Sequence, residues 1–362
     1  MLVAPEDLPI PPTRGGSVQI YLSHLCAALA ERKHIDITLI SPGNVAQSKQ
    51  YTHTPYRHIV VKGDKKTYWR RVHRFVKAGE PDVVQIDNRP LEALHILEAN
   101  PHSKVVLNLH SLTFLGPRHI KTEEARTILQ KADAVVCNSR NLADTIARRY
   151  KLKHNWRRHV IYPGVQSTTD TPALTRGHST DTMRVLFVGR VIRQKGVHIA
   201  IEAIRQQHRQ NNVSLTIVGK THAWEKTYRK QIELDAKGLP IKFVGFVPPH
   251  ELTELYKKHH LLICPSQKHE AFGLVNIEAM NHGLPVIASK LGGVPEAVGK
   301  HGGILVSRYQ MPSEFAKAID KMRDPKRYNK MSKYALRHAQ KFTWKKTARK
   351  FDHLYRDICP AR

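Results

Sequence analysis

The sequence predicts an α/β protein built from two doubly wound domains, each a parallel sheet with helices on both faces. Three observations lead to this prediction. The chain has 362 residues, which is more than one hydrophobic core usually organises. Short β-branched runs alternate with segments whose apolar residues recur every three to four positions, as expected for strands followed by helices. This alternation stops at residues 166–182 and then starts again.

The first half of the chain supplies one set of strand and helix units. Its candidate strands are continuous apolar runs, which are typical of strands buried on both faces. They include "ITLIS", "DVVQI", "KVVLNLH" and "AVVCNS". The stretch 166–182 is then rich in Ser, Thr, Pro and Gly, and this composition indicates a linker. We therefore expect an amino-terminal domain at 1–165.

The second half repeats the pattern from "RVLFVG" to "GGILV", with helices expected at about 195–210 and 249–259. A second doubly wound domain is therefore predicted at 183–341. The last residues, 342–362, place aromatic and apolar side chains on one helical face with Lys and Arg between them. This spacing predicts an amphipathic helix with no strand after it.

Composition argues against several classes of protein. No apolar run approaches the roughly 20 residues needed to span a bilayer, and no export signal is visible, so we expect a cytoplasmic protein. The four cysteines lie far apart without a CxxC pattern, and the 23 histidines form no HExxH pattern. The sequence therefore predicts neither a disulfide framework nor a metal site.

The net charge is strongly positive. The chain has 59 Lys and Arg residues against 30 Asp and Glu residues, a formal net charge of +29. Such a charge favours a polyanionic partner, although it also suits a solvated surface. Basic residues gather at 62–77, at 148–158 and after 320, without an RNA-binding signature or zinc finger. We therefore favour a membrane surface or an anionic acceptor over nucleic acid, and keep a basic nucleic-acid-binding protein as an alternative.

Two glutamates flank the predicted start of a helix in the second domain. Glu270 lies in the loop after the strand "LLICPS", and Glu278 lies about one and a half turns inside the helix. The helix start would offer an anion the backbone N–H groups of Phe272, Gly273 and Leu274, and glycine lets a phosphate approach closely. Carboxylates accept hydrogen bonds from vicinal hydroxyls, so one could hold a sugar and the other a ribose, with phosphates between them on the N–H groups. The alternative is a helix-capping charge and a solvated glutamate.

Two cations follow the first strand of the same domain. In "RVLFVGRVIRQKG", Arg190 comes directly after the strand and Lys195 precedes the next helix. Both are expected at the strand edge where ligands of such sheets bind. There they would neutralise a diphosphate whose charge grows as it leaves. The alternative is two more bases in a basic protein.

Together, four stretches of this sequence resemble the family 4 glycosyltransferases, a retaining group with the GT-B fold of two Rossmann-like domains. They are "VGRVIRQKG", "IKFVGFVPPHELTELYKKHHLLICPS", "HEAFGLVNIEAMNHGLPVIASKLGGVPEAV" and the closing "FTW". The resemblance covers nearly the whole chain. The "IDNRP" element and the general pattern also resemble transferases of the bacterial cell envelope and spore coat. It implies transfer of a sugar from a nucleotide diphosphate sugar, with UDP favoured over GDP, to a glycan, lipid-linked or cell-surface acceptor. No cofactor is implied to be required.

The resemblance also implies roles for single residues. Arg190 and Lys195 would contact the donor diphosphate, and Glu278 would contact the ribose. Glu270 would hold the transferred sugar together with the backbone at 272–274. No carboxylate need attack the sugar, since the leaving oxygen can receive the proton of the acceptor. A catalytically idle GT-B scaffold remains the other alternative.

Further expectations concern the first domain. "TRGGSVQIYLSHL" resembles the family's glycine loop, so Gly15 and Gly16 would lie close to donor and acceptor; the alternative is an ordinary turn. His110 ends the strand "KVVLNLH" and matches a histidine near the reacting sugar, although a lone histidine is often structural. Ser139 is expected to cap a helix, and the role of "QIDNRP" (85–90) is left open.

The final helix would cross back to the first domain, with Trp344 and Tyr355 as packing residues. By the same resemblance, the protein would be cytoplasmic, either peripheral on the inner face of the membrane or associated with the spore coat.

Overall fold

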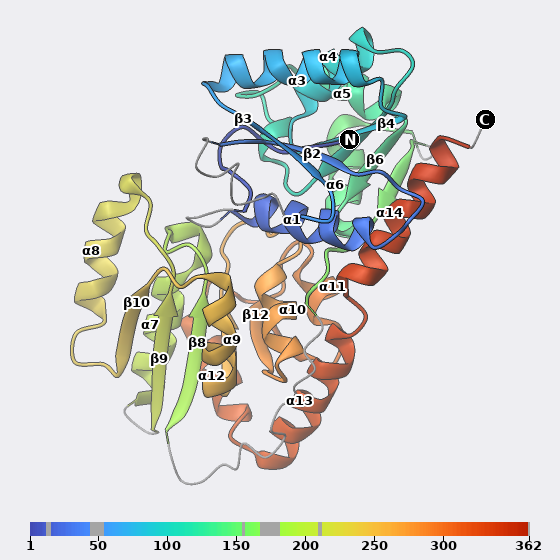
Figure 1. Ribbon diagram of the computed structural model, residues 1–362. Coiled ribbons are helices and arrows are strands. Elements are labelled where there is room, and N and C mark those ends of the chain that lie inside the picture. Colours follow the sequence, from blue (N-terminus) through green and yellow to red (C-terminus); the bar gives the residue numbers. More distant parts are fainter. Residues whose placement is uncertain (12–15, 44–53, 154–155, 167–181, 209–211, 361–362) are drawn as a thin grey trace. The chain divides into compact units, whose positions relative to one another are not determined.

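Figure 1 shows the computed structural model of the chain. The residues that the structure describes are 1–11, 16–43, 54–153, 156–166, 182–208 and 212–360. The chain divides into two compact units, the first made of Met1–Gly164 and Thr343–Arg362 and the second of Val165–Phe342. Each unit holds one parallel sheet with helices beside it, so the predicted α/β class with two doubly wound sheets is confirmed. All but the two end residues of the predicted linker, 166–182, lie outside the described residues.

The sheet of the first unit has seven parallel strands in the order β3-β2-β1-β4-β5-β6-β7. The strands are β1 (Leu2–Val3), β2 (Thr38–Pro42), β3 (Arg57–Val61), β4 (Val83–Asp87), β5 (Lys104–Leu109), β6 (Ala134–Cys137) and β7 (Arg158–Val160). The central strands are buried on both faces, as their continuous apolar sequences predict. The strand order reverses between β1 and β4, and ligands of such sheets bind at the carboxyl ends of the strands beside this point.

Side chains cap the amino ends of several helices of the first unit. The helices of this unit are α1 (Ser17–Ala30), α3 (Lys65–Gly79), α4 (Pro90–Ala99), α5 (Thr122–Lys131), α6 (Arg140–Tyr150) and α14 (Trp344–Ile358). The Asp64 carboxylate caps α3 by accepting a hydrogen bond from the N–H of Thr67 at 2.8 Å. The Ser139 hydroxyl caps α6 by accepting one from the N–H of Leu142 at 3.0 Å, so its predicted capping role is confirmed.

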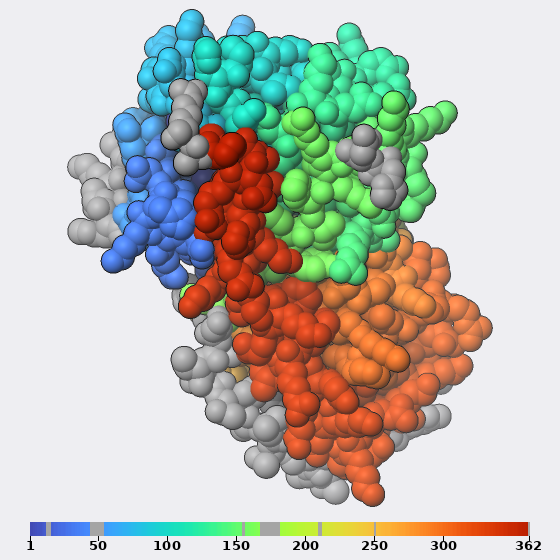
Figure 2. Space-filling model, turned by 90° about the vertical axis from the view of Figure 1, so that its right-hand side faces the viewer, coloured from blue at the N-terminus to red at the C-terminus, as the bar shows by residue number. Residues whose placement is uncertain are grey.

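Helix α14 belongs to the first unit, where it packs against α1. In Figure 2 it is the red segment that lies over blue residues of the amino-terminal part of the chain. Its buried residues Phe351 and Leu354 join a core cluster shared with α1 and the sheet. The buried Asp352 carboxylate forms ion pairs with Arg32, just beyond α1, and with Nε2 of His34 at 2.9 Å. Apolar packing and the ion pairs of Asp352 therefore both hold α14 in place.

The sheet of the second unit has six parallel strands in the order β10-β9-β8-β11-β12-β13. The strands are β8 (Met183–Val188), β9 (Val213–Val218), β10 (Ile241–Gly245), β11 (Leu261–Cys264), β12 (Val286–Ser289) and β13 (Gly303–Val306). The strand order reverses between β8 and β11, so this unit has a switch point of its own.

Helices cover both faces of the second sheet. They are α7 (Val197–His208), α8 (Lys226–Asp235), α9 (Pro249–Lys258), α10 (Leu274–Asn281), α11 (Val294–Val298), α12 (Pro312–Lys321) and α13 (Pro325–Ala339). Val185 and Phe187 of β8 pack into one core cluster with α7, α8 and α12, whereas Leu186 packs into a second cluster with α9, α10 and α11. This alternation follows from the two-residue period of a strand.

No helix among the described residues combines the length and the apolar character that crossing a membrane requires.

Candidate functional site

The loops that follow β8 and β11 meet at the switch point of the second unit. Gly196 has a left-handed φ of 71°, and a Cβ atom there would lie 1.9 Å from the carbonyl oxygen of Pro265. The N–H of Gln267 also donates a hydrogen bond to the carbonyl of Gln194 at 2.8 Å. Only glycine permits this close approach, which brings Lys195 beside the loop after β11.

Lys195 and Glu270 form an ion pair between these two loops. Both side chains are partly buried, with 25% of Lys195 and 19% of Glu270 exposed. The Ser266 hydroxyl donates a hydrogen bond to the same carboxylate oxygen of Glu270 at 3.3 Å. Partial burial strengthens such a pair relative to one in open solvent. The fold thus brings together a cation and a carboxylate that the sequence places on separate loops.

Two glycines that sequence analysis did not single out fix the backbone of Glu270. The N–H of Gly293 donates a hydrogen bond to the carbonyl oxygen of Glu270 at 2.8 Å. Gly292 has a φ of 58°, and a Cβ atom there would lie 2.1 Å from that same oxygen. The signal was present as the paired glycines of "KLGGVPE", but the loop that they hold is visible only in the fold.

The amino end of α10 has no side-chain cap. Gly273, the residue just before α10, has a φ of 85°, and a Cβ atom there would lie 2.5 Å from Nδ2 of Asn276. The N–H groups of Gly273 and Leu274 have no acceptor among the described residues, so this end can bind an anion. The Phe272 side chain is 2% exposed and packs on Phe342, so only its backbone can contact a ligand.

Glu278 lies further along α10 and is not part of the ion pair between the loops. Tyr256 on α9 donates a hydrogen bond to its carboxylate at 3.0 Å. Burial raises the pKa of Glu278, and the hydrogen bond from Tyr256 lowers it by a smaller amount. A carboxylate can accept about four hydrogen bonds, so Glu278 can accept others from a ligand.

Arg190 follows β8 directly and is exposed. The loop after β9 passes close to it, because a Cβ atom at Gly219 would lie 1.7 Å from the carbonyl oxygen of Gly189. Within the described part of the chain, the Arg190 guanidinium forms no hydrogen bond or ion pair. The structure therefore places Arg190 after β8, as expected, without joining it to Lys195.

His110 follows β5 in the first unit and contacts a buried carboxylate. Its Nε2 lies 2.7 Å from Oδ1 of Asp87, at the end of the neighbouring strand β4. Asp87 also accepts hydrogen bonds from Nδ2 of Asn108 at 2.7 Å and from Nε2 of Gln85 at 2.8 Å. The ring of Tyr21 meets the imidazole edge to face, with 4.5 Å between centroids. The sequence predicted a role for His110, whereas the role of the stretch at 85–90, which contains Gln85 and Asp87, was left open.

Gly16 precedes α1 with a φ of 132°. L side chains rarely adopt this φ, so another residue here would be strained, and its Cβ atom would displace the ends of the Gln19 and Leu8 side chains, at 2.6 and 2.9 Å. Gly15 lies outside the described residues. The role of both glycines beside a ligand stays a prediction.

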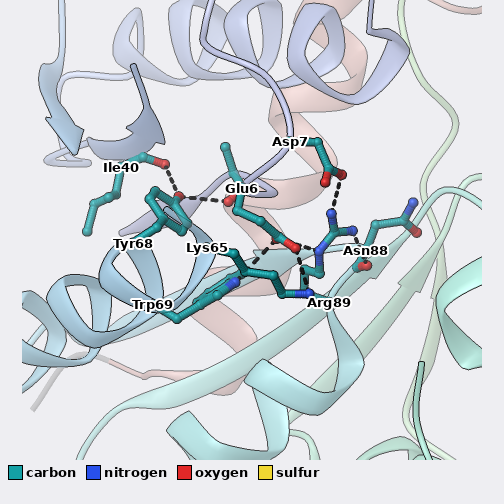
Figure 3. A network of polar contacts seen from close by, with 9 residues as sticks. Glu6, Asp7, Ile40, Lys65, Tyr68, Trp69, Asn88 and Arg89 are labelled. Atoms are coloured by element: carbon teal, nitrogen blue, oxygen red, sulfur yellow. Dashed lines mark hydrogen bonds and ion pairs between the residues drawn. The ribbon is translucent and has the colours of Figure 1, made fainter. Parts of the chain in front are cut away.

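Arg89, from the stretch "QIDNRP", is the centre of the polar network in Figure 3. It is 5% exposed, forms ion pairs with Glu6 at 2.6 Å and with Asp7, and lies 3.9 Å from the ring centroid of Phe114. Glu6 also pairs with Lys65 at 2.9 Å. Burial alone would raise the pKa of Glu6, but the hydrogen bond and charge of Arg89 lower it below its ordinary value. The network fixes the loop after β1.

One group of side chains has metal-ligating atoms close together, although no metal site was predicted. His73 on α3 and Glu92 and His95 on α4 place their ligand atoms within 4.8 Å of one another. The two ring nitrogens lie 3.7 and 3.8 Å from Oε2 of Glu92. When the histidines are protonated, the contact of His73 with Glu92 is an ion pair between the two helices, and the contact of His95 with Glu92 is an ion pair within α4.

Two family models match this chain. The model described as glycosyl transferases group 1 matches residues 153–338, which is 186 of the 362 residues. The model described as glycosyltransferase family 4 matches residues 15–168.

Single proteins show the same similarity. The putative glycosyltransferase YtcC of Bacillus subtilis (strain 168) is 27% identical over 378 residues, covering 98% of this chain and 91% of YtcC. Spore coat protein SA of the same organism is 27% identical over 376 residues, covering 98% of each chain. Among solved structures, Anabaena Alr3699/HepE in complex with UDP and glucose superposes with a TM-score of 0.78 at 20% identity, covering 97% of this chain and 98% of HepE.

Proposed function

The chain belongs to the glycosyl transferases group 1, as its sequence predicts, and we propose that it moves a sugar from a nucleotide diphosphate sugar to an acceptor hydroxyl with retention of the anomeric configuration. That it is a glycosyltransferase follows from the family and from its relatives. The observation that supports the donor class is the Lys195–Glu270 pair beside the uncapped amino end of α10. It combines positive groups for phosphates with a carboxylate for hydroxyls.

The donor diphosphate binds where positive charge is available. The N–H groups of Gly273 and Leu274 and the ammonium group of Lys195 provide it at the ends of β8 and β11. Arg190 is exposed and has no partner among the described residues, so it is free to turn toward the phosphates. These groups stabilise the charge that develops on the diphosphate as its bond to the sugar breaks.

The two carboxylates bind the hydroxyl groups of the donor. Glu270 accepts hydrogen bonds from the transferred sugar, and Glu278 accepts them from the ribose. The bond between C1 of the sugar and the diphosphate oxygen breaks, and a bond from C1 to the acceptor oxygen forms on the same face. The acceptor proton passes to the leaving diphosphate oxygen, and His110 contacts the reacting sugar. No carboxylate of the protein becomes bonded to C1.

A UDP-sugar is the first donor to test, in preference to a GDP-sugar. Support comes from the similarity to HepE, whose structure holds UDP and glucose. The test is a panel of nucleotide sugars, with binding measured by thermal shift and slow release of nucleoside diphosphate measured by mass spectrometry. NMR coupling constants of the anomeric proton in donor and product establish retention or inversion. A chain that binds donors without turning them over would be an idle scaffold.

The first unit carries an exposed basic face on α3 and on the residues just before it. Tyr68, Trp69 and Val72 turn into the core, and the exposed basic residues of this face are Lys62, Lys65, Lys66, Arg70, Arg71, Arg74 and Lys77. We propose that this face attaches the enzyme to an anionic membrane or polymer near a glycan, lipid-linked or cell-surface acceptor. The similarity to spore coat protein SA supports a cell-surface polymer.

Vesicle binding tests the basic face. Each Lys or Arg near an anionic surface contributes about 1 kcal/mol, so replacing four of them with Gln should weaken binding to phosphatidylserine vesicles by about a thousandfold. The four are Lys66, Arg70, Arg74 and Lys77, since Lys65 is engaged with Glu6. The control replaces four exposed residues of α13, which are Lys326, Arg327, Lys330 and Lys333. Donor hydrolysis should be unchanged in both variants, and equal loss of vesicle binding in both would contradict a role for α3.

A further inference from the structure

Tyr355, on the carboxyl-terminal helix α14, reaches the residues that hold His110. Its hydroxyl donates a hydrogen bond to Oε1 of Gln85 at 2.6 Å, across 270 positions of sequence. Nε2 of Gln85 donates to Oδ2 of Asp87 at 2.8 Å, and Oδ1 of Asp87 lies 2.7 Å from Nε2 of His110. The four side chains therefore form one continuous chain of hydrogen bonds, and Tyr355 does more than pack.

Chemistry fixes the direction of each hydrogen bond in this chain. An ionised carboxylate only accepts, so Gln85 must turn its NH₂ group toward Asp87 and its carbonyl oxygen away from it. That oxygen needs a donor, which the Tyr355 hydroxyl supplies. Without the hydroxyl, the amide can rotate by half a turn and place its oxygen against the carboxylate, where the two repel. The hydroxyl thus selects the orientation in which Gln85 supports Asp87.

The other end of the chain determines which nitrogen of His110 carries a hydrogen. Asp87 accepts from Nε2, so Nε2 is protonated, and Nδ1 is the nitrogen left for other contacts. The backbone N–H of His110 donates a hydrogen bond to Oδ1 of Asn88 at 3.0 Å. With only 11% of its side chain exposed, His110 has little freedom to leave this position.

We propose that Tyr355 is a positioning residue for sugar transfer, which acts through Gln85 and Asp87 to hold His110 with Nε2 protonated and Nδ1 available to the ligand. The inference rests on the proposed role of His110 beside the reacting sugar. It makes α14 part of the site of the first unit. Tyr355 then has a role in the reaction in addition to its role in packing.

Three ionisable groups besides His110 face Asp87. Tyr21 and Cys26 approach from α1 and Tyr355 from α14, and burial raises the pKa of all three, with the Asp87 charge raising each further. All three stay protonated at pH 7. Within the described residues, no Lys or Arg forms an ion pair with Asp87.

The test is the ¹⁵N chemical shifts of the two ring nitrogens of His110 in ¹⁵N-histidine-labelled protein, because these shifts report which nitrogen carries the hydrogen. The signals are assigned by comparison with His110→Gln. In the unaltered chain Nε2 should carry the hydrogen. Tyr355→Phe weakens the support that Gln85 gives to Asp87, and Asp87→Asn removes the carboxylate itself. Both variants should move the shifts toward a mixture of the two tautomers, and Asp87→Asn should move them further. This order of effects distinguishes a chain of hydrogen bonds from a general loss of packing.

Tyr150→Phe is the matched control, because Tyr150 is a buried tyrosine of the same unit whose hydroxyl donates to the carbonyl of Leu115. It should leave the ¹⁵N shifts of His110 unchanged. If Tyr355→Phe matches this control in the ¹⁵N shifts of His110, the inference is wrong. Should Tyr355→Phe fail to fold, Gln85→Met removes the same link.

Turnover separates this inference from the proposed function. Where a donor is turned over, Tyr355→Phe should lower kcat about five- to tenfold, as expected for one lost hydrogen bond, and leave KM within about twofold. Absence of turnover in the unaltered chain with every nucleotide sugar would overturn the proposed function alone, because the ¹⁵N shifts are read without a substrate.

Discussion

Replacing Glu270 with Gln tests the proposed donor site where its geometry is best defined. The change keeps the size of the side chain and removes its charge. Lys195 then loses its ion-pair partner, and Ser266 faces a neutral amide. Because the pair is only partly buried, we expect the free energy of unfolding to fall by about 1 kcal/mol or less. A larger effect on turnover would therefore not arise from unfolding.

The effect of Glu270→Gln on turnover can be worked from hydrogen bonds. A carboxylate can accept from two neighbouring sugar hydroxyls, whereas the amide has a single accepting oxygen. One charge-assisted hydrogen bond is then lost, at about 2 kcal/mol, and the other becomes neutral and weakens by about 1 kcal/mol. The sum of about 3 kcal/mol corresponds to a decrease in kcat/KM of roughly a hundredfold.

The assay is release of nucleoside diphosphate from the best donor of the panel, run beside thermal denaturation. Glu314→Gln is the control, since Glu314 lies in the same unit and pairs with Arg308 at 3.0 Å and with Lys317 at 3.2 Å. That variant should keep its activity within about twofold, as a surface pair contributes little. Full activity in Glu270→Gln would remove Glu270 from the mechanism.

Three further predictions test other parts of the account. Burial raises the pKa of Glu278, and ribose hydroxyls favour its charged form. Donor affinity, measured by calorimetry, should therefore fall as the pH drops through this raised pKa. Glu278→Gln should abolish this pH dependence. Gly273→Ala should weaken donor binding about tenfold or more, whereas Gly238→Ala, at a similar φ with open space around it, should affect only stability. Asp352→Asn should lower the free energy of unfolding in urea by about 1–3 kcal/mol at pH 7. The pKa of Asp352 is lower in the folded state than in the unfolded state, so its contribution to stability is full above its unfolded-state pKa and is lost as the pH falls through its folded-state pKa.

Much of the candidate site in the second unit could be predicted from sequence, because periodicity places its residues at strand ends. Strand patterns put Lys195 and Glu270 in loops at the carboxyl ends of β8 and β11, and chain order makes these strands neighbours in a doubly wound sheet. A glycine before a helix, as at Gly273, is also a local signal. What the sequence did not show is that Gly292 and Gly293 hold the backbone of Glu270, because their contact joins two loops that no periodicity relates.

Other residues around His110 in the first unit could not be predicted from sequence. His110 carried a local signal, as a histidine at a strand end. Asp87 and Gln85 lie on one face of β4, but the role of a buried carboxylate is clear only when its hydrogen-bond donors are known. Tyr355, which donates to Gln85, lies 270 positions further along the chain. No role could be assigned to Arg89 from sequence. The fold shows that it forms an ion pair with Glu6, in the loop after β1.

A crystal structure of the chain with a hydrolysis-resistant phosphonate analogue of its best nucleotide sugar tests the central claim most directly. We predict the diphosphate on the N–H groups of Gly273 and Leu274 with Lys195 beside it. The Glu270 carboxylate should lie within hydrogen-bond distance of the sugar hydroxyls, and Glu278 within reach of the ribose. An analogue bound away from the loops after β8 and β11, or with its sugar out of reach of Glu270, would contradict the proposed site.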